Sequence, residues 1–181
     1  MKNNDFKHIE LWNVSKVTSM KKLFSKHKDF NKDISNWDVS NVRNMKGIFR
    51  DCEYFNQDIG DWDVGKVKNM SGMFEYCKNF NQDIGDWDVS NVTNMNHMLY
   101  KCWKFNQDIG DWDVSNVTNM RGMFNRSRKF DQSVIRKWNI NKETNTSNMF
   151  SDYVFDHSLM DLIDLYEIGI SIKTDFYVFP Q

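Results

Sequence analysis

Residues 105–124 read FNQDIGDWDVSNVTNMRGMF, and this stretch decides the fold because the chain repeats it. The segment FNQDIGDWDVSNVTNM also stands at 80–95, and close variants begin at Phe55 and Phe30. The tryptophans keep the same interval of 25 residues along the chain, with a final step of 26: Trp12, Trp37, Trp62, Trp87, Trp112 and Trp138. Self-similarity at a fixed period is the signature of a repeat architecture, in which neighbouring copies complete one another's core.

The copies divide a single domain into four parts. Residues 1–29 form an N-terminal partial repeat and cap, and residues 30–129 contain four full repeats of 25 residues. Residues 130–155 form a degenerate repeat with one insertion, in which Thr146 replaces the first methionine. Residues 156–181 leave the pattern, and we expect them to form a C-terminal cap with a helix at 158–168, a stop at Gly169 and a strand at 171–179.

Each unit contains two different hydrophobic periods. Met120, Met123, Phe124, Ser127 and Phe130 fall at the spacing of an amphipathic helix. Before them, apolar residues alternate with polar residues in WDVS at 112–115, which is typical of a short strand. We therefore predict an α/β repeat, a curved leucine-rich-repeat-like solenoid with one short strand and one short helix in each coil of 25 residues. Strands stack more closely than helices, so the array should curve with its strands inside.

Three blocks in this order carry a resemblance to a known family. They are Phe-Asn-x-Asp-Ile, Trp-Asp-Val-Ser-Asn-Val and Asn-Met-x-x-Met-Phe, and they recur over about residues 5–155. The chain resembles the BspA-like leucine-rich-repeat surface proteins, in particular the repeat of unknown function found in mycoplasma lipoproteins and in large DNA viruses. The resemblance implies a leucine-rich-repeat-like solenoid with a role in surface attachment or protein binding. It brings no catalytic residues.

Composition and charge exclude several other classes. A formal net charge of −1 provides no basic field for nucleic acid, and no stretch approaches the apolar length of a transmembrane helix. The first residues lack the apolar core of a signal peptide, and no lipidation cysteine accompanies them. We therefore expect an intracellular or virion-associated protein of viral or mollicute origin, although the surface proteins that it resembles are exported.

Aspartates recur at the same places in successive copies. Such DxxDxD clusters offer oxygen ligands to calcium, and the candidate ligands are Asp58, Asp61, Asp63, Asp83, Asp86 and Asp88. The alternative is that the carboxylates accept N–H hydrogen bonds within turns. The turn interpretation is preferred, because the glycine-rich spacing of calcium-binding β-helices is absent.

The remaining chemically active residues do not indicate an enzyme. Cys52, Cys77 and Cys102 occupy one helical-stripe position and are expected to be small core residues, as are the methionine and tryptophan columns. The four histidines His8, His27, His97 and His157 share no column and accompany no nucleophile motif. We expect no catalytic site and no cofactor.

The copies differ mainly on the predicted outward helix face, with the interface candidate between residues 100 and 129. Exposed aromatic and basic side chains resemble the anchors of protein interfaces, and the candidates are Tyr76, Tyr100, Lys101, Trp103, Lys104, Arg126 and Arg128. The alternative is a solvated face with scattered aromatics. The leading hypothesis is a non-enzymatic protein-binding or adhesion-type scaffold with a protein partner. The alternatives are a structural virion or coat component that associates through solenoid ends or sides, and a calcium-dependent adhesin.

Overall fold

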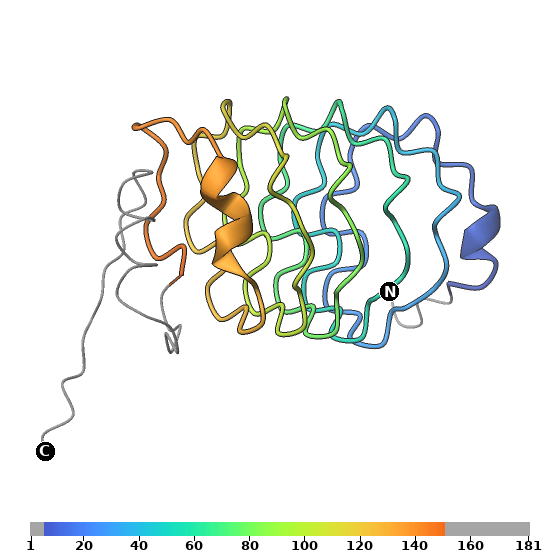
Figure 1. The fold of residues 1–181 in the computed structure, drawn as a ribbon. Coiled ribbons are helices and arrows are strands. Elements are labelled where there is room, and N and C mark those ends of the chain that lie inside the picture. Colours follow the sequence, from blue (N-terminus) through green and yellow to red (C-terminus); the bar gives the residue numbers. More distant parts are fainter. Residues whose placement is uncertain (1–5, 151–181) are drawn as a thin grey trace, which may run out of the picture.

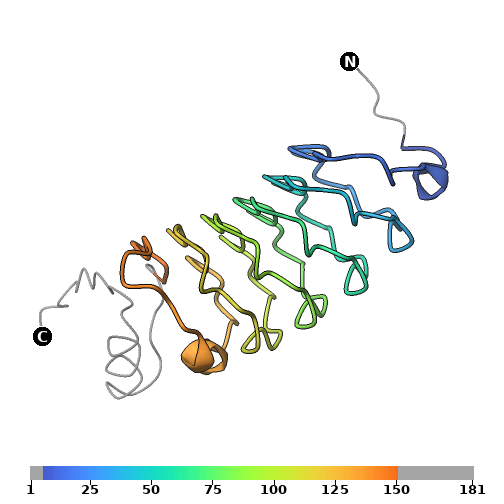
Figure 2. The same cartoon turned by 90° about the horizontal axis from the view of Figure 1, so that it is seen from above.

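The computed structural model describes residues 6–150, in which the repeat copies form a stack of irregular coils. Figure 1 shows the coils side by side, and Figure 2, seen from above, shows that each lies directly against the next. Two short 3₁₀ helices lie near the ends of the stack, η1 (Ile9–Leu11) and η2 (Gln132–Lys137). Outside these helices, the described chain contains turns, one bend and five isolated parallel bridges.

The expected α/β fold is therefore wrong. Residues 6–150 contain no α-helix and no β-strand, so no coil has the strand and the helix of a leucine-rich-repeat-like solenoid. The expected curvature loses its basis as well, because it followed from the different spacings of strands and helices. The expected C-terminal helix and strand at 158–168 and 171–179 lie outside the described residues.

Two left-handed turns replace the predicted helix in each coil. The first has a glycine in three copies, Gly47, Gly72 and Gly122, with φ of 59°, 59° and 61°. The second follows four residues later, where Asp51 and Tyr76 have φ of 63° and 65°. A left-handed residue cannot continue a right-handed helix, so the chain instead makes successive bonds between residues three apart, such as Ile48 N–H to the Met45 carbonyl and Arg50 N–H to the Gly47 carbonyl.

The predicted strand fails for a different reason. Trp112 and Val114 are buried while Asp113 and Ser115 are exposed, so the alternation itself is correct. However, the Ser115 N–H donates to Asp113 Oδ1 at 3.0 Å, and the Val117 N–H donates to the Val114 carbonyl at 2.9 Å. Local turns take these backbone donors, and the strand ladder does not form.

The coils are joined instead by a directional backbone ladder on the turn segment. The N–H groups of Met45, Gly47, Phe49 and Asp51 donate to the carbonyls of residues 69, 71, 73 and 75 in the next coil, at 2.8–3.0 Å. Residues 70, 72, 74 and 76 donate in the same way to the coil after that. Every second N–H therefore points toward the C-terminal end of the stack, and the carbonyls between them point toward the N-terminal end.

Side chains add further ladders between coils. The indole Nε1–H of Trp87 donates to the Ile59 carbonyl of the preceding coil at 3.1 Å, and the other buried tryptophans repeat this bond. The thiol of Cys77 donates to the Phe49 carbonyl at 3.0 Å, and Ser127 supplies the equivalent bond to the Leu99 carbonyl in its coil. Each of these carbonyls also accepts a backbone N–H within its own coil, as the Ile59 carbonyl does from Trp62 at 3.2 Å, so the side-chain bond is a second one and contributes about 0.5–1.5 kcal/mol.

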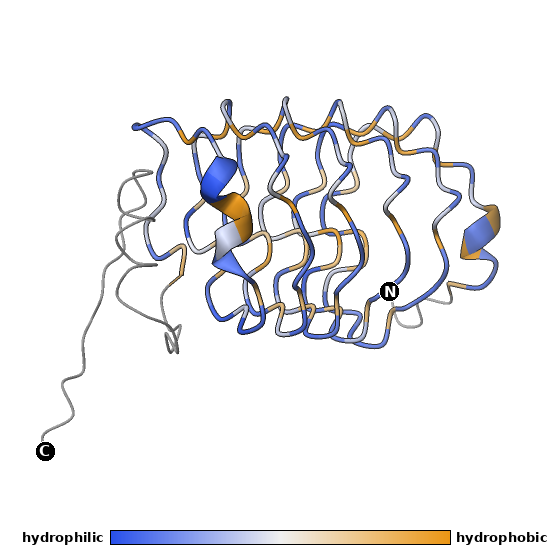
Figure 3. Cartoon of the chain, in the orientation of Figure 1, coloured by the Kyte–Doolittle hydropathy of each residue, from blue (hydrophilic) through white to orange (hydrophobic). Residues whose placement is uncertain are grey.

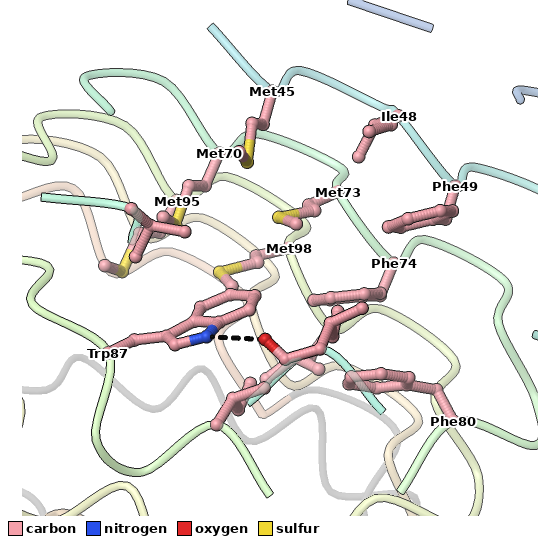
Figure 4. Packing of buried hydrophobic residues seen from close by; sticks show 14 of the residues in the cluster. Met45, Ile48, Phe49, Met70, Met73, Phe74, Phe80, Trp87, Met95 and Met98 are labelled. Carbon is pink, nitrogen blue, oxygen red and sulfur yellow. Dashed lines mark hydrogen bonds between the residues drawn. The ribbon is translucent and has the colours of Figure 1, made fainter. Parts of the chain in front are cut away.

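The core runs the length of the stack (Figure 3). Phe49 and Phe74 are parallel at 5.7 Å between ring centroids, and Phe55 and Phe80 are parallel at 6.0 Å. Figure 4 shows the methionine file of Met45, Met70 and Met95 beside these rings. Apart from the end residue Trp12, the repeat tryptophans are at most 4% exposed, and the core prediction for the methionine and tryptophan columns is confirmed there.

The degenerate copy continues the stack as far as Phe150. Asn119 bridges Asn145 at an interval of 26 residues, and Phe124 stacks on Phe150 at 5.5 Å. In this copy η2 begins at Gln132, where Asp131 accepts the Ser133 N–H as an N-cap. Thr144 restores a core bond through its hydroxyl, which donates to the Val117 carbonyl at 2.7 Å.

Candidate partner-binding surface

The seven predicted interface residues lie at or beside the second left-handed turn of their coils. Tyr76, Lys101 and Arg126 occupy that turn position themselves, with φ of 65°, 59° and 64°. Because each is 25 residues from the next, the ladder places them in one file along the stack. The expected helix face is thus a row of turns, and it presents the same side chains on one edge.

Tyr76, Tyr100 and Lys101 form the first contact group on this edge. The ammonium of Lys101 lies 4.5 Å from the Tyr76 ring centroid and 5.4 Å from the Tyr100 centroid. The two tyrosine rings meet edge to face at 5.4 Å, and His97 contacts Tyr100 at 5.2 Å. The tyrosines are half-buried, so their ring positions are held while part of each remains accessible.

Trp103 forms the second contact group. Its ring is 40% exposed and has the Lys78 ammonium at 4.7 Å and the Arg128 guanidinium at 5.7 Å from its centroid. Such cation–π contacts hold an exposed ring in one orientation and contribute about 0.5–1 kcal/mol at exposed sites. An exposed, oriented tryptophan with basic neighbours is the arrangement found at the centre of protein interfaces.

Charge on this edge changes along the stack. In the first coils, Glu53 bridges Lys28 at 3.2 Å and Lys78 at 3.0 Å, and hydrogen bonds from Lys78 and then Lys28 lower its pKa. Arg50 pairs with Glu75 at 3.2 Å, although burial of the Glu75 carboxyl is the larger effect and raises its pKa. Within residues 6–150, by contrast, no carboxylate lies within ion-pair distance of Lys101, Lys104, Arg128 or Lys129.

The sequence-based selection missed Lys78 and Glu53 as parts of this edge. They were variable positions, and they belong to the file that continues through Trp103 and Arg128 at intervals of 25 residues. That shared interval was the available signal. Stacking places residues of one file in contact, so Lys78 was a predictable neighbour of Trp103.

The calcium candidates are occupied mostly by local turns. Asp58, Asp63, Asp83 and Asp88 each accept the N–H of the residue two positions later, at 2.9–3.1 Å. The turn interpretation of these two aspartate columns is confirmed by those bonds. Asp61 and Asp86 are exposed, and no three His, Cys, Asp or Glu side chains in the described part of the chain gather as metal ligands would.

The cysteine column is part of the core, as predicted. Cys52, Cys77 and Cys102 are fully buried free thiols that donate to core carbonyls. Burial raises the pKa of Cys52 to about 12 and raises the pKa values of the other two well above the ordinary value. These thiols are therefore protonated at neutral pH and poor nucleophiles.

Comparison with protein families gives the relationship of the chain. The family described as "Mycoplasma protein of unknown function, DUF285" matches residues 1–100 and again residues 59–162. The chain belongs to this family. The two overlapping matches agree with the tandem repeat, and the DUF285 chain is of a repeat type found in mycoplasmas. No curated protein and no solved structure matches the DUF285 chain.

The sequence predicted no transmembrane helix, and the helices of the described coils can be compared with that prediction. Across residues 6–150 of the DUF285 chain, every helix is too short and too polar to pass through a bilayer.

Proposed function

We propose that this DUF285 protein is a non-enzymatic scaffold of the adhesion type that binds a protein partner. Its binding surface comprises Tyr76, Tyr100, Lys101, Trp103, Lys104, Arg126 and Arg128, called here the aromatic–basic surface. A relationship to the BspA-like surface proteins belongs to the same proposal. The partner presents an acidic face with an apolar centre.

The observation that carries the proposal is the environment of Trp103. A tryptophan with 40% of its surface exposed costs solubility, yet two cations from neighbouring coils hold it in place. Nothing in the stack requires it, because the equivalent residues of other coils are Glu53, Lys78 and Arg128. Its aromatic surface is therefore available to a partner, and tryptophan, tyrosine and arginine are the residue types enriched at binding hot spots.

The unpaired cations support the choice of an acidic partner. Lys104 and Arg128 are exposed; Lys104 follows Trp103 directly in the sequence, and Arg128 contacts the Trp103 ring from the next coil. Carboxylates that meet such cations at the rim of an interface accelerate association and orient the partner. The apolar ring at the centre would supply most of the affinity.

The test compares two variants that remove the same kind of side chain. Tyr100→Ala with Trp103→Ala removes the centre of the aromatic–basic surface. Tyr54→Ala is the control, since Tyr54 is 48% exposed and has Lys28 at 5.6 Å over its ring, as Trp103 has Lys78. Quantitative pull-down from the source cells should lose a specific protein with the double variant and retain it with the control.

Thermal melts establish that both variants fold. A partner that remains bound to the folded double variant at the wild-type level contradicts the proposed surface. The recovered partner, once purified, should bind less tightly at high salt if its contact face is acidic.

A further inference from the structure

The backbone ladder gives the stack two chemically different ends. On the turn segment, each interior coil presents four carbonyls toward the N-terminal end and four N–H groups toward the C-terminal end, whereas outside this segment single bonds such as Arg43 N–H to the Thr18 carbonyl run the other way. In the second coil the accepting carbonyls are those of residues 44, 46, 48 and 50. The equivalent carbonyls of the first coil belong to Ser19, Lys21, Leu23 and Ser25, and no N–H within residues 6–150 reaches any of them.

Side chains on the same end coil are also incompletely covered. Trp12 stacks on Trp37 at 6.5 Å but is 45% exposed, whereas Trp37 is 4% exposed. The Trp37 indole donates to the Ile9 carbonyl, and no preceding coil among the described residues offers Trp12 the same bond. Leu11 and Leu23 are 76% and 38% exposed. This N-terminal face, defined by Trp12, Leu23 and the carbonyls of 19, 21, 23 and 25, has the features that later coils bury.

The chemistry of the N-terminal face restricts its partner. Two such faces cannot pair with each other through the ladder, because carbonyl oxygens would oppose carbonyl oxygens. The occupant has to supply N–H groups and apolar side chains, as an added strand does at a sheet edge. It also has to tolerate a basic coil, because residues 6–30 contain two acids, Glu10 and Asp29, against six exposed lysines: Lys7, Lys16, Lys21, Lys22, Lys26 and Lys28.

One segment of this chain has the complementary composition. Residues 156–181 contain five carboxylates and one lysine, with apolar residues throughout SLMDLIDLYEI and SIKTDFYVF. The single proline of the chain is Pro180, so almost every residue of the segment retains its backbone N–H. The segment follows the last coil in the sequence, and that coil lies at the opposite end of the stack from the N-terminal face (Figure 2).

We propose that the acidic C-terminal segment of one copy binds the N-terminal face of a second copy, so that the chains associate head to tail. A head-to-tail arrangement places the next copy's N-terminal face beside the end from which the segment leaves. Binding within one chain would instead require the segment to return along the polar outside of all the coils. The interface is heterologous, so association extends beyond a dimer or closes into a ring.

The test uses the full chain and reverses charge on each partner separately. Lys16→Glu with Lys21→Glu alters the N-terminal face, since both lysines are exposed and neither side chain makes an ion pair or hydrogen bond within residues 6–150. Asp161→Lys with Asp164→Lys alters the segment. The control is Lys46→Glu with Lys68→Glu, which makes the same charge change on exposed lysines of interior coils.

Light scattering at several concentrations and low salt should give masses above one chain for the wild type and for the control. Each charge-reversed variant alone should associate about tenfold more weakly, because the reversal cancels the net charge of the face or of the segment that it alters. An equal mixture of the two variants should associate again, since each variant offers the charge that the other lacks. An unfolded variant would not associate again in the mixture, so renewed association also shows that both variants are folded.

Three outcomes overturn the proposal. The first is a wild type that has the mass of one chain at every concentration. The second is association that the control weakens as much as the Lys16 and Lys21 pair does. The third is a mixture that remains as dissociated as its components. A single-chain mass together with a loss of stability on Lys16→Glu and Lys21→Glu would indicate binding within one chain instead.

Discussion

Gly47→Ala tests the backbone of the repeat directly, because a helix and a left-handed turn predict opposite effects. Gly47 has φ of +59° in the turn that replaces the expected helix. A Cβ at this position would lie 3.5 Å from Lys22 Cγ and 3.6 Å from Arg50 Cβ, which are ordinary contact distances. The substitution therefore changes backbone strain without a steric clash.

The magnitude follows from the two backbone conformations. Alanine in a left-handed conformation costs about 1–2 kcal/mol, and restriction of the unfolded chain returns about 0.4–1 kcal/mol. A net loss of about 1 kcal/mol is expected, which for a chain of this length lowers the melting temperature by about 2–4 °C. In the interior of a helix the same change would raise stability by about 0.5–1 kcal/mol.

Urea unfolding followed by tryptophan fluorescence measures the difference. Gly47→Asn is the matched variant, since asparagine accepts left-handed backbone more readily than alanine and should cost less. Lys22 and His97 already occupy this file with φ of 59° and 53°, so a side chain as such is tolerated there. An increase in the free energy of unfolding for Gly47→Ala would refute the turn and restore the helix.

Three further changes probe the core and its charges. Trp87→Phe removes the indole donor to the Ile59 carbonyl at 3.1 Å, although that carbonyl keeps its bond from the Trp62 N–H, so urea unfolding should show a loss of about 0.5–1.5 kcal/mol from the hydrogen bond, and an unchanged midpoint would contradict the ladder. Cys77→Ser keeps a donor for the Phe49 carbonyl, and its free energy of unfolding should stay within about 1 kcal/mol of the wild type. Cys77→Ala removes the donor and should lose about 1 kcal/mol or more. Equal losses in the two variants would argue against the thiol bond. Burial raises the pKa of the Glu75 carboxyl despite the nearby Arg50. The protonated carboxyl therefore stabilises the fold at acid pH, and this stabilisation is lost as the pH rises through the raised pKa. Glu75→Gln should therefore gain stability relative to the wild type between pH 4 and pH 7, and a relative loss over that range would mean that the ion pair outweighs burial.

The sequence was sufficient to locate the core but not to determine the backbone. Large apolar residues at a fixed interval of 25 have to pack on their equivalents, whatever path the chain takes between them. The spacing of Met120, Met123 and Phe124 also suits two consecutive tight turns, because bonds between residues three apart place the same side chains inward. The distinguishing signal was the glycine two residues after the first methionine of the stripe, at Gly47, Gly72 and Gly122, which is unfavourable inside a helix.

For the binding surface as well, the sequence was sufficient to predict some features and not others. Tyr100, Lys101 and Trp103 were recognised because they vary between otherwise similar copies, and that reasoning does not depend on a helix. The contact of Trp103 with Lys78 follows from their interval of 25 residues, whereas the position of the Lys101 ammonium against the Tyr100 ring required the backbone path. The aspartates of two columns were explained correctly by turn bonding, since an Asp followed two residues later by Gly or Ser commonly forms such a turn.

Most residues that the copies share now have a structural role between coils. Tryptophan and cysteine donate to carbonyls of the preceding coil, the asparagine and glutamine after each repeat phenylalanine bond the neighbouring backbone, and aspartates close turns within a coil. These roles account for the shared residues without reference to any ligand. Selection for binding can therefore act only on files that stacking leaves free, such as the file of Glu53, Lys78, Trp103 and Arg128. A function that required the shared aspartates or cysteines would have to remove them from bonds that hold the coils together.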